Sequence, residues 1–301
     1  MVDRGGQTRI QAIVVNYNAG EALLRCIRSV LEQGPGVALT VIDNASGDGS
    51  ADDADKEFGE ERRFTLLRNP DNRGFAVAVN QAARQADAEG ADYLLILNPD
   101  CEVGPGALEA LRQALDSDPK AGLAGPRVTD GAGRIQRATL RRFPSPWTSL
   151  MTFSGLWRLA DRWPLFRGVE YPAPLPDTVT TAEAVSGACM LVRASAFFDV
   201  GGMDEAYALH GEDLDLMFRL HQRGGYCLYV PGAGVIHLQG LSSRSRPLWV
   251  HWQKHRGMQR FYLKFQATGI ARPWRWPVSA LVLAGIWLRF ALLLPIILLR
   301  R

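Results

Sequence analysis

Two short clusters of carboxylates are the residues of this chain best suited to chemistry. Asn98-Pro99-Asp100 follows the apolar run of residues 93–97, and Glu212-Asp213-Leu214-Asp215 opens a stretch with helical spacing. A carboxylate that ends a buried strand lies at the edge of the sheet where α/β proteins bind ligands. A carboxylate at a helix start is kept ionised by backbone N–H groups and the helix dipole. The first cluster can hold a metal on a diphosphate and the second can act as a base, with a strand-end cap and a helix N-cap as the alternative.

Composition limits the class of protein. The chain has 301 residues, 47% of them hydrophobic, which is enough for one large α/β domain with additions. Its four cysteines are far apart and form no C-x-x-C pair: Cys26, Cys101, Cys189 and Cys227. This spacing favours reduced thiols in the core over a zinc site or a disulfide framework. Residues 1–6 lack the apolar core of a signal peptide, so we expect the catalytic part in the cytoplasm.

The first 130 residues alternate between strand and helix patterns. Buried-strand patterns cover residues 10–15, 37–42, 64–67 and 93–97, and helical spacing covers residues 21–32 and 74–88, with a third helix expected after the turn at 46–50. This alternation predicts an α/β fold with a mostly parallel, Rossmann-like sheet and helices on both faces.

Polar residues follow three of these strands. If the strands are parallel, these residues lie at one edge of the sheet. Asn16-Tyr17-Asn18 follows the first strand and Asp43-Asn44 the second. Tyr17 can flank a nucleobase, and Asp43 can accept hydrogen bonds from a base or a ribose. Asn72-Arg73-Gly74 supplies a cation and backbone N–H groups suited to phosphate. The sequence contains neither G-x-G-x-x-G nor a P-loop motif, which disfavours a dinucleotide oxidoreductase and a P-loop enzyme.

These motifs, in this order, resemble the family 2 inverting glycosyltransferases of the GT-A nucleotide-sugar-binding fold. The resemblance runs through residues 14–18, 41–50, 72–76, 98–100, 186–193, 200–205 and 211–215 to His237, and covers about residues 8–240. It is strongest to a bacterial rhamnosyltransferase-like branch, in which Asn-Pro-Asp stands in place of the Asp-x-Asp metal motif.

The resemblance implies a role for each candidate residue. It implies that Asp100, with His237 as a further contact, holds Mg²⁺ or Mn²⁺ on the donor diphosphate, and that Asn98 in place of an acid lowers the metal affinity. It implies that Asp213 is the catalytic base, which deprotonates an acceptor hydroxyl for a single inverting displacement. The implied substrate-binding residues are Tyr17, Asn18, Asp43, Asn44, Arg73, Asn98, Gly187 and Glu212.

The tail carries charge of one sign. No Asp or Glu follows Asp215, and the last 86 residues hold 13 Lys and Arg, so the tail is about +13 and the front part about −10. This asymmetry indicates a polyanionic partner, membrane lipid or nucleic acid, against the alternative of a solvated basic face. The apolar stretch of residues 278–299 and the interleaved Trp and Arg of residues 244–276 favour an anionic membrane surface and no nucleic acid.

Two arrangements of this apolar stretch stay open. A single C-terminal span would place Arg289 in the middle of the bilayer and carry Arg300 and Arg301 across it. An in-plane or re-entrant helix, with Arg289 facing headgroups and Pro295 bending the end, avoids both costs and is favoured. Residues 129–182, broken by prolines and rich in aromatic residues, predict an acceptor-side insertion or lid, or else an aromatic-stapled loop.

The sequence thus predicts an inverting glycosyltransferase that transfers a sugar, with dTDP-rhamnose the favoured donor, to a lipid-linked or cell-envelope glycan. We expect a catalytic domain at residues 1–240, with a nucleotide-binding half at 1–128 and an acceptor half at 129–240. Membrane-associating helices at 241–301 would hold it on the cytoplasmic face of the plasma membrane, as a monotopic protein or by one span. Two alternatives are a nucleotidyltransferase that makes nucleotide-sugars and a non-catalytic, membrane-tethered glycan-binding protein.

Overall fold

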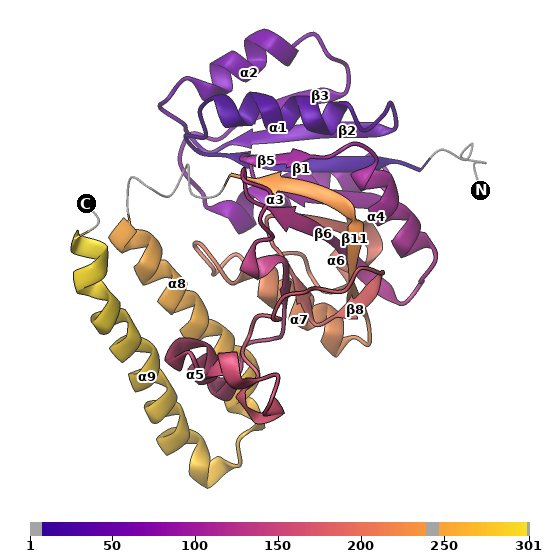
Figure 1. The fold of residues 1–301 in the computed structure, drawn as a ribbon. Helices are drawn as coiled ribbons and strands as arrows, with labels where there is room; N and C mark the ends of the chain where they lie inside the picture. The colour runs from indigo at the N-terminus through magenta and orange to yellow at the C-terminus, as the bar shows by residue number, and fades with distance from the viewer. Residues whose placement is uncertain (1–7, 239–246, 300–301) are drawn as a thin grey trace.

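A computed structural model describes residues 8–238 and 247–299 (Figure 1). One large sheet has the strand order β3-β2-β1-β4-β10-β6-β11-β5, and β8 pairs with β11 outside this path. Its first four strands are parallel, as the sequence predicts: β1 (Ile10–Asn16), β2 (Val37–Asp43), β3 (Phe64–Arg68) and β4 (Tyr93–Leu97). The alternating α/β fold and its mostly parallel sheet are confirmed.

Helices cover both faces of the sheet because successive side chains of each strand point to opposite faces. Ala12 and Val14 belong to the core under α1 (Glu21–Leu31), α2 (Ser50–Phe58) and α4 (Ala107–Asp116). Ile13 and Val15 belong to the core under α3 (Phe75–Ala88), α6 (Ala194–Asp199) and α7 (Glu212–Gln222). All four cysteines are buried free thiols, as predicted.

The strands after β4 complete the sheet with mixed strand directions. They are β5 (Cys101–Val103), β6 (Ala121–Thr129), β8 (Thr180–Ala182), β10 (Cys189–Arg193) and β11 (Tyr226–His237). Strand β10 is antiparallel to both β4 and β6, whereas β11 is parallel to β6. A separate two-stranded sheet pairs β7 (Leu140–Arg141) with β9 (Ala184–Val185).

The aromatic, proline-rich segment between β7 and β8 forms short helices beside the C-terminal ones (Figure 1). These are α5 (Pro146–Ser154), η2 (Leu156–Leu159) and η3 (Pro164–Phe166). Ser145 starts α5 with a capping box, in which its hydroxyl accepts from the Thr148 backbone and Thr148 accepts from the Ser145 backbone. The indole Nε1 of Trp147 donates to the carbonyl oxygen of Leu165 at 2.8 Å, which ties α5 to η3.

The C-terminal helices form an antiparallel pair (Figure 1). Helix α8 (Pro247–Phe261) continues into η4 (Tyr262–Gln266) and η5 (Ala267–Gly269), and the chain then returns as α9 (Arg272–Leu299). A chain of side-chain contacts joins the two: the rings of Trp252 and Trp287 lie 4.6 Å apart, Trp287 donates to Gln259 at 2.9 Å, and the Tyr262 and Ser279 hydroxyls lie 3.1 Å apart.

Helix α9 is the one described helix that is long and apolar enough to cross a membrane, judged by length and composition. It starts at Arg272 and stays helical through Pro277 and Pro295. Arg289 lies within α9, where its Nη1 is 3.1 Å from Nε2 of His255 and its guanidinium lies over the ring of Phe153. That Arg289 faces headgroups stays a prediction. The predicted domain boundary at 240/241, like Arg300 and Arg301, lies outside the described residues.

Candidate functional site

The carboxyl ends of β1, β2 and β4 bring the predicted polar residues to one edge of the sheet. Asn16 is in register with Asp43, and Val14 with Leu97, the residue before Asn98. Most residues of these strands are buried and apolar, and polar side chains follow where the strands end. This is the crevice in which open α/β sheets bind ligands.

Asp43 is buried at this edge and its carboxylate is held from both sides. Asn16 donates from Nδ2 to Oδ1 at 2.8 Å, and the backbone N–H of Ser46 donates to Oδ2 at 3.1 Å. Asn16 also donates to Oγ of Ser50 at 2.9 Å, which links the carboxylate to the start of α2. A carboxylate held in this way keeps one orientation and has lone pairs left to accept further hydrogen bonds.

The other residues predicted to bind the nucleotide surround Asp43. Asn44 is buried, accepts from Nδ2 of Asn69 at 2.8 Å and donates to the carbonyl oxygen of Gly74 at 3.2 Å. Asn18 has a positive φ of 53° and accepts from the N–H of Gly47 at 2.8 Å, so it shapes the loop beside β1. Tyr17, which lies between Asn16 and Asn18 in the sequence, is half-buried.

Arg73 is a predicted site residue whose side chain makes no hydrogen bond or ion pair with the described, buried residues of this edge. Its side chain is half exposed, and its Nε lies 3.6 Å from Oδ1 of Asp71, another exposed residue. It precedes Gly74, whose positive φ of 83° starts α3. Its contact with phosphate therefore stays a prediction.

Asp100 and His237 face each other although they are far apart in the sequence. His237 ends β11, which pairs with β5 next to Asp100, and its Nε2 lies 3.2 Å from Oδ1 of Asp100. On the far side of the ring, Nδ1 donates to Oε1 of Gln136 at 3.0 Å, and Gln136 donates back to the His237 carbonyl at 2.8 Å. Because an amide oxygen only accepts, this contact puts a ring proton on Nδ1, and Nε2 is the ring nitrogen that faces Asp100.

This pair fits a divalent cation. Adjacent ligands of an octahedral Mg²⁺ or Mn²⁺ ion lie about 3 Å apart when the bonds are about 2.1 Å, close to the separation seen here. A thiol, Cys101, lies within reach of the same point, but it donates to the carbonyl of Ala188 at 3.2 Å, and burial raises its pKa well above the ordinary value. This thiol is therefore protonated and hydrogen-bonded to Ala188, whereas Asp100 and His237 face each other. Asn98 contacts Nε2 of His237 at 3.4 Å and so borders the same site.

Asp213 lies in the first turn of α7 and reaches the same region through Gly187. A Cβ placed on Gly187 would meet Oδ2 of Asp213 at 2.5 Å and its Cβ at 2.7 Å, so only glycine lets the carboxylate lie here. The next residue, Ala188, accepts from the backbone N–H of Asn98 at 2.8 Å. Two consecutive residues before β10 thus join the two carboxylate clusters that the sequence suggests.

Arg141, which sequence reasoning missed, is the charged partner of Asp213. Its Nη2 donates to Oδ2 of Asp213 at 2.7 Å, and both side chains are largely buried. Burial raises the pKa of Asp213, but the charge and hydrogen bond of Arg141 more than offset it and hold that pKa below its ordinary value. Burial, together with the charge of Asp213, raises the pKa of neighbouring Glu212 to about 8. At neutral pH, Asp213 is ionised and Glu212 is protonated.

Asp215 differs from its neighbours in the cluster because it is fully buried in ion pairs. Arg219 reaches Oδ1 at 2.5 Å and Lys264 reaches Oδ2 at 2.6 Å, and Lys264 also contacts Asp204 at 2.6 Å. Lys264 belongs to η4, so this network fastens the C-terminal helices to α7.

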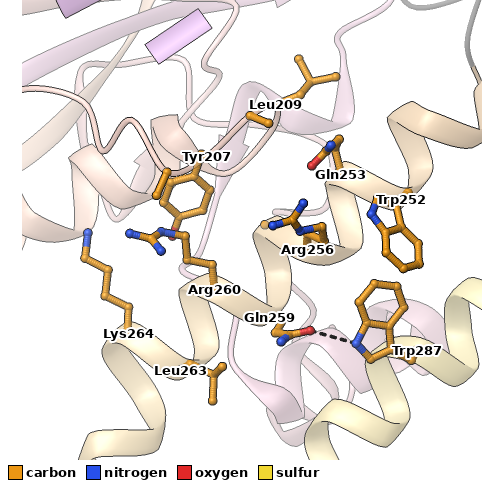
Figure 2. A pocket seen from close by; sticks show the side chains of 13 residues that line it. Tyr207, Leu209, Trp252, Gln253, Arg256, Gln259, Arg260, Leu263, Lys264 and Trp287 are labelled. Carbon is orange, nitrogen blue, oxygen red and sulfur yellow. Dashed lines mark hydrogen bonds between the residues drawn. The ribbon is translucent and has the colours of Figure 1, made fainter. Parts of the chain in front are cut away.

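A cavity of about 720 Å³ lies between the loop of residues 206–209, α8 and α9 (Figure 2). Arg256 and Arg260 line it beside Trp252 and Trp287, and none of the carboxylates of the sheet edge does. It is a basic and aromatic cavity of the C-terminal helices, distinct from the cleft around Asp213.

Comparison with known proteins gives consistent matches. Residues 11–173 match the family described as Glycosyl transferase family 2. The chain is 31% identical over 282 residues to the N-acetylglucosaminyl-diphospho-decaprenol L-rhamnosyltransferase of Mycobacterium tuberculosis, which covers 89% of this chain and 88% of that protein. It is 30% identical over 176 residues to the rhamnosyltransferase WbbL of Escherichia coli, covering 58% of this chain and 62% of that protein.

Two solved structures have a similar fold at low sequence identity. One is GalNAc-T7 with UDP, GalNAc and Mn²⁺, with a TM-score of 0.60 and 17% identity, covering 88% of this chain and 52% of that one. The other is the mannosyltransferase PcManGT of Pyrobaculum calidifontis with GDP-Man and Mn²⁺, with a TM-score of 0.59 and 19% identity, covering 97% of this chain and 79% of that one.

Proposed function

Because the chain belongs to glycosyl transferase family 2, we propose that it is an inverting glycosyltransferase that moves rhamnose from dTDP-rhamnose to a lipid-linked glycan. The family and its GT-A fold make the chain a glycosyltransferase with rhamnosyltransferase relatives. The inverting course, the donor, the metal and the acceptor are the proposed parts. The nucleotidyltransferase and glycan-binding alternatives fit these matches less well.

The observation that carries this proposal is the path from Asp100 to Asp213. Asn98 is hydrogen-bonded to Ala188, and Gly187 lies against Asp213, so Asp100, the proposed cation ligand, and Asp213, the proposed base, lie on either side of a two-residue bridge. A donor with its diphosphate at Asp100 would place its sugar beside Gly187, between the leaving phosphate and Asp213. That order supports attack from the face opposite the nucleotide.

Asp100 and His237 would hold the divalent cation, which supplies positive charge to the diphosphate that leaves. Asp43 would accept hydrogen bonds from the nucleoside, with Tyr17 flanking the base. Asp213 would accept the proton of the acceptor hydroxyl as its oxygen bonds to the anomeric carbon and the bond from that carbon to the phosphate oxygen breaks. The nucleoside diphosphate leaves with the bonding electrons, and configuration inverts.

We propose the acceptor from the mycobacterial relative. Its name says that it acts on N-acetylglucosaminyl-diphospho-decaprenol. Such an acceptor is an anionic lipid, so the enzyme must work at a membrane. The basic tail and the apolar helix α9 support this location, on the cytoplasmic face.

The packing of α8 on α9 supports an in-plane arrangement over a span. Contacts between the two helices run along the middle of α9, from Ser279 to Phe290. A spanning α9 would therefore draw α8, with Lys254, Arg256 and Arg260, into the hydrocarbon at about 2.5–3.5 kcal/mol for each charge. We place both helices at the headgroup level, as a monotopic anchor.

Mass spectrometry of the product tests the proposal directly. Full-length protein in detergent receives dTDP-rhamnose, Mn²⁺ and a short-chain polyprenyl-diphosphate N-acetylglucosamine, and we expect the acceptor to gain one deoxyhexose. Asp213→Asn is the matched inactive control. Transfer from a UDP- or GDP-hexose in preference to dTDP-rhamnose would overturn the proposed donor, and nucleotide-sugar synthesis without transfer would overturn the proposed reaction.

A further inference from the structure

Exposed apolar side chains gather in two separate stretches of this chain. Of the 20 large apolar side chains that the described residues expose, seven lie between residues 147 and 165 and ten between residues 249 and 298. The described part before residue 135 exposes none. Since isolated exposed apolar residues are ordinary but contiguous ones indicate a partner, the first stretch needs an explanation of its own.

We propose that residues 146–166 form a second membrane-contacting element, which lies with α9 on an anionic bilayer. This inference rests on the proposed membrane location and adds to it a segment more than 100 residues before α9 in the sequence. The contributing side chains are those exposed between α5 and η3: Trp147, Leu150, Phe153, Leu156, Leu159, Trp163 and Leu165. We call them the α5 face.

Two contacts hold this segment beside the C-terminal helices. The guanidinium of Arg289, in the middle of α9, lies 5.5 Å from the ring centroid of Phe153. Gln266 of η4 donates to the carbonyl oxygen of Pro144, just before α5. Figure 1 shows α5 alongside the α8–α9 pair, away from α1 and α2. The α5 face and α9 thus adjoin each other in space.

The charges of the two stretches identify the partner as an anionic lipid surface. Residues 146–167 carry three arginines, Arg158, Arg162 and Arg167, against the single acid Asp161, and the tail carries no acid at all. Tryptophan, leucine and arginine together are typical of segments that lie at the headgroup boundary. A protein partner of complementary shape would not require an excess of cations around both stretches.

The α5 face also has a consequence for catalysis. Arg141, which holds Asp213, lies five residues before α5 in the two-residue strand β7. A bilayer in contact with α5 would therefore be joined by a short stretch of chain to the cation that holds Asp213.

Site-specific labelling tests the inference because all four native cysteines are buried. Leu165→Cys (66% exposed), Trp276→Cys on α9 (80% exposed) and Val179→Cys before β8 (53% exposed) each give one accessible thiol in the full-length protein. Each is labelled with an environment-sensitive fluorophore and mixed with vesicles of 30% phosphatidylglycerol in phosphatidylcholine that contain a spin-labelled quencher lipid.

We expect quenching and a blue shift for the probes at residues 165 and 276, and no change at residue 179. A response at 276 without one at 165 would overturn the α5 face and leave the tail anchor in place. No response at either site would overturn the membrane location itself, and an equal response at 179 would overturn a defined face.

A variant that adds negative charge to the α5 face gives a second readout. The double variant Trp163→Asp, Leu165→Asp should weaken vesicle binding roughly 10-fold, with Val179→Asp as the control of matched exposure. Donor hydrolysis by the double variant should stay at the wild-type rate, which shows that it folds. Unchanged vesicle binding by a folded double variant would contradict the inference.

Discussion

Arg141 donates one guanidinium nitrogen, Nη2, to both Oδ2 of Asp213 at 2.7 Å and the carbonyl oxygen of Val185 at 2.6 Å. The carbonyl belongs to β9, which pairs with the strand of Arg141, so the cation is fixed by the same small sheet that carries it. The proposed base thus has a permanent positive charge beside it. This keeps Asp213 ionised and fixes its orientation, at the cost of a weaker base.

Removal of this cation should shift the pH dependence of transfer. Arg141→Met removes the largest influence that opposes burial at Asp213, so the pKa of Asp213 rises, and the acidic limb of the kcat/KM profile should move up by about 1–3 pH units. Arg142→Met is the matched control, because Arg142 turns to the carbonyl of Gly168 and the ring of Tyr171. An acidic limb that stays in place in Arg141→Met would contradict the assignment of Asp213 as the base.

Asp213→Asn keeps the shape of the side chain and removes the proton acceptor. We expect transfer to fall at least about 10²-fold, the scale of general-base catalysis, with the affinity for dTDP hardly changed. Stopped-flow or calorimetric measurement of dTDP binding separates the two effects. Near-normal turnover of this variant would show that another group takes the proton.

The proposed metal site can be tested in two ways: by removing a ligand, and by removing Gln136, which orients a ligand without being one. Asp100→Ala should abolish most Mn²⁺ binding in the presence of dTDP, and Gln136→Leu should weaken it about 10–100-fold because the imidazole of His237 loses its fixed orientation. Electron paramagnetic resonance of free Mn²⁺ measures both. Cys101→Ala should bind Mn²⁺ as the wild type does, since its thiol donates to Ala188. Equal Mn²⁺ affinity in all four proteins would mean that the site holds no metal.

Glu212 should make the protein less stable as the pH rises. Its pKa is raised from 4.5 to about 8, so between those values the unfolded chain has released a proton that the native state still holds. The native state is therefore favoured most below about pH 4.5, and this contribution is lost progressively up to about pH 8. Glu212→Gln should raise Tm relative to the wild type more at pH 8 than at pH 5.

The exposed Glu60→Gln serves as the control for that measurement and should change Tm equally at both pH values. If the Tm difference between Glu212→Gln and wild type is the same at pH 5 and pH 8, Glu212 is ionised in the folded protein.

The nucleotide half could be predicted from sequence because its signals are local. Runs of buried apolar residues define β1, β2 and β4, and the first polar residue after each run necessarily lies at the sheet edge. Two parallel strands in register then bring Asn16 and Asp43 together without further information. Gly187 was predicted from resemblance, and the structure gives its physical reason in the close approach of Asp213.

The acceptor half could not be predicted in the same way, because its contacts are set by distant residues. Arg141 and Arg142 are identical in type, and only the pairing of β7 with β9 decides which of them reaches Asp213, 72 residues away. Gln136 lies 101 residues from the His237 ring that it orients. For Arg289, the sequence shows a charge within an apolar helix, but it does not show that the side chain contacts His255, which lies on another helix.

On the proposed bilayer, the attachment of α8 and η4 to the catalytic domain would set the height of Asp213 above the lipid. Lys264 bridges Asp204 and Asp215, and Gly257 lets α8 rest against the carbonyl of His210, three residues before Asp213. Such a rigid spacer would select acceptors by the distance of their terminal sugar from the lipid. We expect a lipid with one sugar on its diphosphate to outcompete one that carries several, and a mixture of the two, scored by which gains rhamnose, measures that reach.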